Sequence, residues 1–403
     1  HACTLIETSN FRIIIDPWVI GPCNGNAWYP LRSEPATKKD IPTDVDAIYI
    51  SHEHEDHFQA ESLCEFNKNT QIFICNFPTD RFHNAVKDLG FSNVTALNSW
   101  RPEKINNDLE ITSIKNPDLM FEDSALLIKS KEGTIFCQTD CKMDFESIKK
   151  VKKAKPDIGF FMYSPANWYP IAYNYPEEEK NEIALKRKKN KINGFVNYVN
   201  QIQPKIAIPY AGGILLPHKS QLKFNENTTS MFACPDEAMI AWDNSNNTSS
   251  KVIMMGAGDE ISPNGNHVKK SEPILSTNKM EIATKLSEIV SDNLEQRWKN
   301  EGIADSKLSN QIIDYFNKII SENPKARKHI DMKVQLIAEG ENGGSFNFDI
   351  TKDNNTNSFA NEGEIEDWNY FMKIPAHLIQ KAVNDELLWE TLFLSCRWQG
   401  NRK

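Results

Sequence analysis

The chain has 403 residues, which is enough for a sizeable core and most naturally for two domains. Its 39% hydrophobic and 25% charged residues are typical of a soluble globular protein, and we find no apolar run long enough to span a membrane. The net charge of −9 argues against a general nucleic-acid binder, because binding to phosphates favours proteins with an excess of cations.

Eight cysteines are scattered along the chain without a Cys-x-x-Cys pair, and Cys137 and Cys141 are the closest two. This dispersion favours free thiols in a reducing cytoplasm over a disulfide framework. We find neither zinc-ribbon nor iron–sulfur spacing. The first residue is His rather than Met, so we expect the start to be trimmed.

The first part of the chain alternates short apolar strands with helices. The runs ACTLIET and FRIIIDPW are separated by two polar residues and predict a hairpin. Further strands are expected at 46–52, 71–75, 93–98, 109–115, 125–130, 134–140, 157–163, 205–213 and 251–261, and helices at 79–90, 144–154, 177–203 and 235–244. The class is therefore α/β or α+β, with stacked layers.

A turn-rich stretch, SPNGNHVKKSEP, predicts a domain boundary, with a catalytic domain over 1–265 and a small α+β accessory domain over 275–403. Amphipathic helices are expected at 280–300 and 306–323, followed by strands at 332–340, 345–351 and 368–374 and a closing helical or mixed segment. This order faintly resembles a sterol-carrier type domain, which would imply apolar substrates or a dimer contact.

The stretch SHEHEDHF, residues 51–58, directly follows the apolar run AIYI. His52 and His54 alternate along an extended segment and therefore project to one side, while Asp56 and His57 follow in the turn. His52 and His54 could hold one metal ion, and Asp56 and His57 a second. A charged surface loop is the alternative, but the spacing His-x-His-x-Asp-His favours metal binding.

This spacing resembles the signature of the metallo-β-lactamase fold superfamily, and IIIDPW, with Asp16, resembles its early strand motif. The resemblance implies an αββα sandwich with metal ligands on loops at one edge of two sheets. It also implies that Asp140, in QTDC, bridges the two ions and that His218, in LLPHKS, binds the second ion. We expect Asp16 to orient a metal-bound imidazole rather than to bind metal itself.

The sequence departs from the superfamily where most hydrolytic members have a third histidine for the first ion. No histidine lies between His83 and His218, and FEDS offers Glu122 and Asp123 instead, of which we prefer Glu122 slightly. Two histidines and one carboxylate form the facial arrangement associated with iron and oxygen activation. We therefore expect two iron ions, with manganese or zinc as alternatives.

Longer stretches resemble the metallo-β-lactamase-like part of the CMP-N-acetylneuraminate hydroxylase family. They include MYSPANWYPIAYNYP, the segment from ALKRKKNK to KFNENTT, and IPAHLIQKAVNDELLWETL near the end. The resemblance implies an oxygenase that uses O₂. The family's Rieske iron–sulfur domain has no counterpart in the sequence, so we expect either a trimmed module or electrons from an external reductase or ferredoxin.

Aromatic residues supply weaker candidates. Tyr163 and Tyr210 end strands that should point at the metal edge and could hydrogen-bond a bound oxygen species, although buried tyrosines more often have structural partners. The loop NWYPIAYNYP could line a substrate pocket with Trp168, Tyr169 and Tyr173, or could be an ordinary packed loop.

The run KRKKNK could hold an anionic substrate or an acidic ferredoxin, but such a run is more often the solvated face of a helix. The leading hypothesis is a non-haem diiron oxygenase that hydroxylates or N-oxygenates a small polar metabolite. The alternative is a dinuclear metal-dependent hydrolase of the lactonase or phosphodiesterase type, with a metal-bound hydroxide as nucleophile. A metal-binding accessory protein without catalysis is a third reading.

Overall fold

The computed structural model describes residues 1–118, 121–227, 230–351 and 358–403, which form two compact units. The first unit contains 1–23, 28–166 and 185–291, and the second contains 24–27, 167–184 and 292–403. This division differs from the predicted boundary between 265 and 275. The first half of helix α6 (Lys279–Asn300) packs on the first unit, where the buried Lys279 ammonium donates to the Phe232 carbonyl over 2.8 Å.

Two sheets form the centre of the first unit. The five-stranded sheet has the order β1-β2-β4-β5-β6, with the predicted antiparallel hairpin β1–β2 followed by parallel neighbours. Its strands are β1 (Thr4–Thr8), β2 (Phe11–Ile15), β4 (Ala47–Ile50), β5 (Gln71–Cys75) and β6 (Val94–Leu97).

The second sheet has seven strands in the order β14-β12-β11-β10-β9-β8-β7. These are β14 (Lys251–Val252), β12 (Ile206–Tyr210), β11 (Ile158–Met162), β10 (Gly133–Cys137), β9 (Ser124–Ser130), β8 (Leu109–Lys115) and β7 (Glu103–Asn106). Two short pairs complete the unit: β3 (Tyr29–Pro30) with β13 (Ile214–Leu215), and β15 (Glu260–Ile261) with β16 (His267–Val268).

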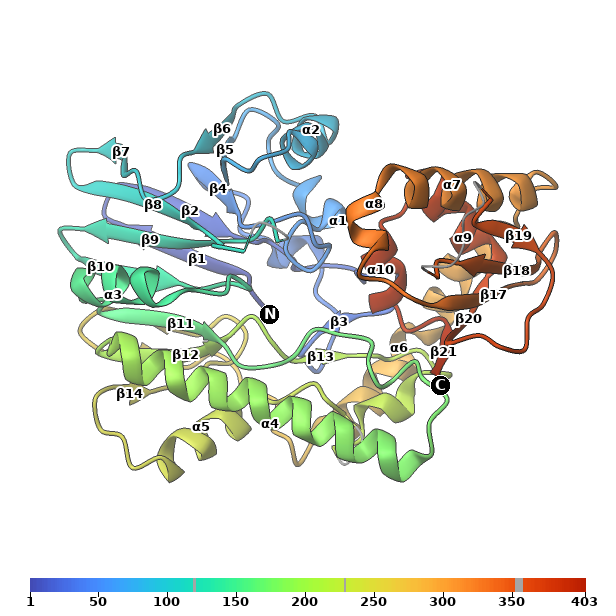
Figure 1. The fold of residues 1–403 in the computed structure, drawn as a ribbon. Helices are drawn as coiled ribbons and strands as arrows, with labels where there is room; N and C mark the ends of the chain where they lie inside the picture. The colour runs from blue at the N-terminus through green and yellow to red at the C-terminus, as the bar shows by residue number, and fades with distance from the viewer. Residues whose placement is uncertain (119–120, 228–229, 352–357) are drawn as a thin grey trace. The chain divides into compact units, whose positions relative to one another are not determined.

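Helices cover the outer face of each sheet, so that the first unit has four layers (Figure 1). Helices α1 (Ala60–Leu63) and α2 (Arg81–Asp88) pack on the five-stranded sheet, whereas α3 (Phe145–Ala154), α4 (Glu177–Ile202) and α5 (Pro235–Asn244) pack on the seven-stranded sheet. Two 3₁₀ turns are η1 (Lys38–Asp40) and η2 (Leu222–Asn225). The predicted αββα sandwich is confirmed.

The alternation of side chains along the strands produces these layers. Ile13 and Ile15 of β2 lie in the core between the sheets, while Ile14 points to the helices on the other face. In β4, Ala47 and Tyr49 face the core between the sheets, and Ile48 faces the helices on the other side. Because both faces are covered, these strands are apolar throughout.

The second unit has a five-stranded sheet in the order β19-β18-β17-β20-β21. Its strands are β17 (Lys333–Glu339), β18 (Gly344–Asp349), β19 (Ala360–Glu362), β20 (Tyr370–Pro375) and β21 (Gln399–Arg402), and its helices include α7 (Leu308–Glu322), α8 (Pro324–Arg327), α9 (Ala376–Val383) and α10 (Trp389–Leu394). An α+β accessory unit was predicted, and its sterol-carrier resemblance stays a prediction.

All eight cysteines are free thiols, and every described helix is too short or too polar to cross a membrane.

The two sheets meet at one edge through a chain of hydroxyl groups. Ser113 of β8 and Ser124 of β9 lie 2.8 and 2.7 Å from the Tyr49 hydroxyl of β4, and Ser124 donates to the Ser51 carbonyl over 2.7 Å. Since Ser124 donates to Ser51, the Tyr49 hydroxyl donates to Ser124 and accepts from Ser113. This chain joins both sheets directly beneath residues 51–58.

We expect Tyr49→Phe to lower the free energy of unfolding by about 1 to 3 kcal/mol, because it leaves buried hydroxyl groups without partners. Ser113→Ala should cost less, since Tyr49 still donates to Ser124. In a double-mutant cycle measured by urea unfolding, the two losses should fall short of additivity by about 0.5 kcal/mol or more. Strict additivity would contradict a coupled chain.

Candidate metal centre

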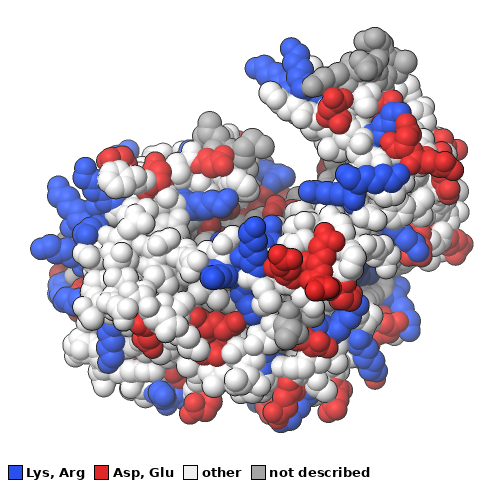
Figure 2. Space-filling model, turned by 60° about the horizontal axis from the view of Figure 1, so that its bottom comes forward, with Lys and Arg blue, Asp and Glu red and all other residues white. Residues whose placement is uncertain are grey.

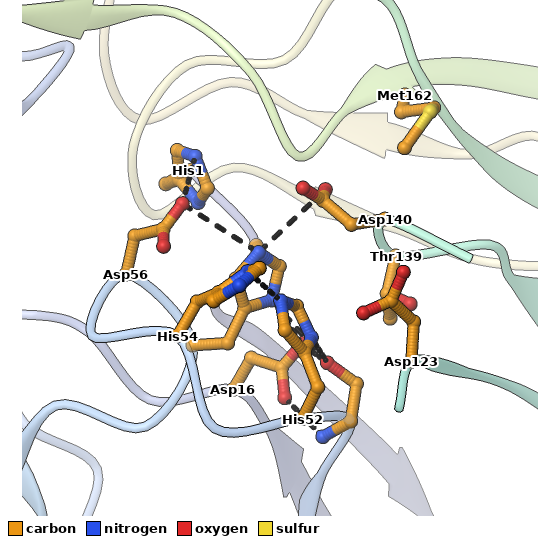
Figure 3. A network of polar contacts seen from close by, with 12 residues as sticks. His1, Asp16, His52, His54, Asp56, Asp123, Thr139, Asp140 and Met162 are labelled. Atoms are coloured by element: carbon orange, nitrogen blue, oxygen red, sulfur yellow. Dashed lines mark hydrogen bonds and ion pairs between the residues drawn. The ribbon is translucent and has the colours of Figure 1, made fainter. Parts of the chain in front are cut away.

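The site lies where four strands end at the same edge of the two sheets. Asp16 follows β2, His52 follows β4, and Asp140 follows β10 after two residues. Asp123 precedes β9, which runs antiparallel to β10, so the beginning of β9 lies beside the end of β10. The fold therefore brings Asp16 and Asp140, which are 124 positions apart in sequence, to one place, as Figure 3 shows.

Among the described residues, three groups of side chains could each hold a metal ion, with ligand atoms within 4.8 Å of one another. The groups share His52 and His57, so they form one continuous centre. They are His52, His54 and Asp123; His52, His57 and Asp140; and His1, Asp56 and His57. In Figure 3, His1 and Asp56 lie on one side of the histidines, and Asp123 and Asp140 on the other.

Asp16 is hydrogen-bonded to the loop that carries the histidines, and its predicted role of orienting a metal-bound imidazole stays a prediction. Its carboxylate accepts hydrogen bonds from the Ser51 backbone N–H over 2.8 Å and from the Ser51 hydroxyl over 2.7 Å. It also lies 2.7 Å from Nδ1 of His57. With its own hydrogen donated to Asp16, the Ser51 hydroxyl accepts from Nδ1 of His52, 2.8 Å away. Both rings therefore carry their proton on Nδ1, and both Nε2 lone pairs face the centre.

His57 is surrounded by carboxylates. Burial alone lowers its pKa, but Asp16, Asp56 and Asp140 outweigh burial and raise the pKa well above the usual value. Its Nε2 lies 3.7 Å from an Asp56 oxygen and 3.6 Å from an Asp140 oxygen, too far for a hydrogen bond, and has no partner among the described residues. Ligands that each lie about 2 Å from one ion are separated by roughly 3 to 4 Å. The spacing fits a shared cation.

His52, His54 and Asp123 form the group expected for the first ion. Nε2 of His52 lies 2.8 Å from Nδ1 of His54. Burial, His57 and His54 lower the pKa of His52 well below its usual value, which favours the neutral imidazole that metals bind. Burial raises the pKa of the Asp123 carboxyl to about 6, with Asp140 adding to the increase and His54 opposing it.

Asp123, rather than the slightly preferred Glu122, is the carboxylate that lies near His52 and His54, and its role as a metal ligand stays a prediction. The Glu122 carboxylate accepts hydrogen bonds from the Thr79 hydroxyl over 3.0 Å and from the Thr79 backbone N–H over 3.3 Å, and it is in none of the three groups. Asp123 is only 9% exposed, and the Asn116 side chain donates to it over 3.3 Å. Neighbouring residues of an extended segment point to opposite sides, so only one of the two can reach the histidines.

Asp140 lies between the two ends of the centre. Burial opposes its ionisation, but His57, His52 and Lys191 outweigh burial and hold its pKa well below the usual value. The preceding residue, Thr139, has φ of +54°, a backbone conformation that a β-branched residue rarely adopts. Its hydroxyl donates to the Ser124 carbonyl over 2.7 Å, which holds the turn in place. Backbone strain of this kind is typical of functional sites.

His1 lies beside the centre, although it was not among the predicted site residues. Its side chain is 3% exposed, and Nε2 lies 3.3 Å from an Asp56 oxygen. The pairing of Thr4 with Ile15 in the β1–β2 hairpin carries His1 to the Asp16 end of that sheet. The predicted hairpin contained this signal, because the residue before β1 must lie near the residue after β2.

His218 is in none of the three groups within the described part of the chain. It is largely buried, and its Nδ1 accepts a hydrogen bond from the Ser220 backbone N–H over 3.2 Å and lies 2.8 Å from the Ser220 hydroxyl. Its role as a ligand of the second ion stays a prediction.

The two tyrosines expected at the metal edge contribute to the core instead. The Tyr210 hydroxyl donates to the Ala2 carbonyl, and the ring contacts Phe160 between the sheets. Tyr163 lies in the core between the seven-stranded sheet and its helices, against Gly212 and Gly213. Both residues thus have packing contacts in the cores, and their predicted role at the metal edge stays a prediction.

The aromatic loop contributes to the core of the second unit. Tyr173 is 1% exposed, its ring contacts Trp398, and its hydroxyl lies 2.5 Å from that of Tyr370. Trp168 contacts Phe393. Tyr173 is thus part of a packed core, whereas substrate contacts of Trp168 and Tyr169 stay a prediction.

The basic run of α4 divides into two roles. Lys188 is buried and pairs with Glu237 over 2.9 Å, which is a structural contact. Burial lowers the pKa of Lys191, while the charges of Asp140 and Asp123 oppose that decrease. On the face drawn in Figure 2, basic and acidic side chains are interspersed.

Comparisons with known proteins agree with this geometry. Residues 1–160 match the beta-lactamase superfamily domain. A protein of Mycolicibacterium smegmatis named for a Rieske 2Fe-2S iron–sulfur protein is 27% identical over 219 residues, which are 53% of this chain and 42% of the relative. The cytidine monophosphate-N-acetylneuraminic acid hydroxylase of Pan troglodytes is 24% identical over 238 residues, which are 57% of this chain and 40% of the relative.

The chain thus spans about two fifths of the length of these curated relatives. Among solved structures, an isothiocyanate hydrolase from Delia radicum gut bacteria has a TM-score of 0.43 and 14% identity, covering 67% of this chain and 97% of that one. The domain match, the four layers and the His-x-His-x-Asp-His loop agree with one another. Residues 1–160 are therefore a metallo-β-lactamase superfamily domain.

Proposed function

We propose that the protein is a non-haem diiron oxygenase. The observation that carries the proposal is Asp123, a carboxylate that lies beside His52 and His54 in the position expected for a third imidazole. Two histidines and one carboxylate with open positions form a ligand set typical of iron sites that activate O₂. Bound iron would supply the oxygen chemistry, in which one substrate molecule, O₂, two electrons and two protons yield one oxygenated product and one water.

The residues of the chain would hold and orient this centre. His52, His54 and Asp123 would bind one ion, Asp56 and His57 the other, and Asp140 would lie between them. Asp16 and Ser51 fix the tautomers of His52 and His57, so that the Nε2 lone pairs are already directed at the ions. Lys191 supplies a cation near Asp140, which favours an anionic group on the substrate.

The names of the relatives support the proposal. One is named for a hydroxylase and another for a Rieske iron–sulfur protein, and both overlap about half of this chain. We therefore propose a small polar metabolite as substrate and an external ferredoxin or reductase as electron donor. We also propose a cytoplasmic location, which the eight free cysteines support.

A metal-dependent hydrolase of the lactonase or phosphodiesterase type is the second candidate. It is favoured by Asp140, which is close to both His52 and His57 and would suit two ions that share a hydroxide. Such an enzyme would need neither O₂ nor reductant, which separates the two candidates.

We expect Asp123→Ala to weaken binding of one of two metal ions by at least roughly 10-fold, because the variant removes a charged ligand. The matched control is Glu122→Ala, which removes the adjacent carboxylate but should keep both ions, since Glu122 bonds Thr79. Metal content after dialysis against a weak chelator, measured by mass spectrometry, compares the two variants. Loss of an ion in the Glu122 variant alone would contradict the assignment.

We expect the protein loaded anaerobically with Fe(II) to consume O₂ and to change its optical spectrum on exposure to air. With reductant present, O₂ uptake should continue, and the zinc-loaded protein should consume none. An oxygen electrode and an absorption spectrum measure both effects.

The zinc-loaded protein also tests the second candidate. If it hydrolyses a generic ester or lactone without reductant, while the iron-loaded protein leaves O₂ untouched, the oxygenase proposal is wrong and the hydrolase takes its place.

A further inference from the structure

His1 occupies a closed position beside the metal centre. Its ring meets those of Trp18 and His57 edge-on, with centroids 5.3 Å away in both cases. Trp18 is itself 2% exposed, and its indole N–H donates to the Gly21 carbonyl over 3.1 Å. The His1 ring is therefore held between a fixed indole and a candidate ligand, next to Asp56 (Figure 3).

The polar atoms at this position are not satisfied by the protein. Nδ1 of His1 is buried and has no hydrogen-bond partner among the described residues, and the same holds for Nε2 of His57. Leaving a buried polar atom without a partner costs about 1 to 3 kcal/mol. Nε2 of His1 and the partnerless Nε2 of His57 lie 3.3 and 3.7 Å from an Asp56 oxygen. Ligand atoms of all three residues lie within 4.8 Å of one another, so together they form a ligand set for a cation.

The backbone around His1 is anchored, so the position is defined before an ion binds. The Ala2 carbonyl accepts a hydrogen bond from the Tyr210 hydroxyl, and Thr4 pairs with Ile15 in the hairpin. Ala2 is fully buried between the sheets. An imidazole held this rigidly loses little conformational freedom on binding metal, which favours tight binding.

We propose that His1 is the imidazole ligand which, with Asp56 and His57, holds the second metal ion. This role was expected of His218, whose Nδ1 is engaged by Ser220 and which lies outside the three ligand groups. The inference rests on the dinuclear centre proposed above and adds a ligand that the His-x-His-x-Asp-His motif does not contain. It would also make the segment that leads into β1 part of the metal site.

The test compares His1→Gln with His218→Gln and with the control His83→Gln on α2, a half-buried histidine far from the motif in sequence. Mn(II) is the probe, titrated into each metal-free protein, with bound ions counted by mass spectrometry and by the electron paramagnetic resonance signal of coupled ion pairs. We expect two ions and a coupled signal for the wild type and for the His83 variant. The His1 variant should bind one ion at least roughly 10-fold more weakly and lose the coupled signal.

A second variant guards against misfolding. His1→Ala leaves space for free imidazole, which should restore the second ion and the coupled signal, and circular dichroism checks that each variant is folded. A His1 variant that keeps two ions with wild-type affinity, while the His218 variant loses one, would overturn this inference and leave the dinuclear centre intact. A wild type that binds fewer than two ions would overturn both.

Discussion

The loop of residues 51–58, which carries the candidate metal ligands, depends on hydrogen bonds to the Asp16 carboxylate. This carboxylate bonds the Ser51 backbone, the Ser51 hydroxyl and His57, and the Asp16 N–H donates to the Tyr49 carbonyl over 3.0 Å. Asp16 is fully buried and has φ of +45°, which aspartate tolerates better than most residues because its side chain can bond locally. The strained backbone at the end of β2 thus directs one carboxylate toward the end of β4. The hydrogen bonds of that carboxylate in turn set the tautomers of His52 and His57.

Charge balance gives the same centre a second constraint. Asp16, Asp56, Asp123 and Asp140 bring four carboxylates into a largely buried region whose imidazoles are neutral when they bind metal. Buried charges that lack partners are costly, and two divalent cations would neutralise four negative charges. The carboxylates raise the pKa of His57, and burial with Asp140 raises that of Asp123 to about 6, so both groups retain protons more readily than usual when no cation is bound. Two bound divalent ions would therefore add to the stability of this edge.

Much of this could be predicted from sequence, because local patterns determine it. The His-x-His-x-Asp-His spacing, the β1–β2 hairpin and the apolar strands with both faces covered all have signals within a few residues. The features that could not be predicted depend on the register in which the strands pair. Whether Glu122 or Asp123 faces the histidines is set by where β9 begins to pair with β8, and the same alternation turns Tyr210 into the core. His1 lies 51 positions before His52, and only the pairing of strands brings it to Asp56.

The choice between hydrolase and oxygenase depends on the charge of the first ion's ligands rather than on the motif. Three neutral imidazoles leave a divalent ion strongly electrophilic, which suits the activation of water for attack on an ester. A carboxylate in place of one imidazole adds a negative charge within bonding distance, and this charge stabilises a higher oxidation state of the ion relative to the divalent one. The same substitution makes the ion a weaker Lewis acid and an easier electron donor. Asn116 and the start of β9 hold Asp123 at that position, and this placement is the structural basis on which we propose redox chemistry rather than hydrolysis.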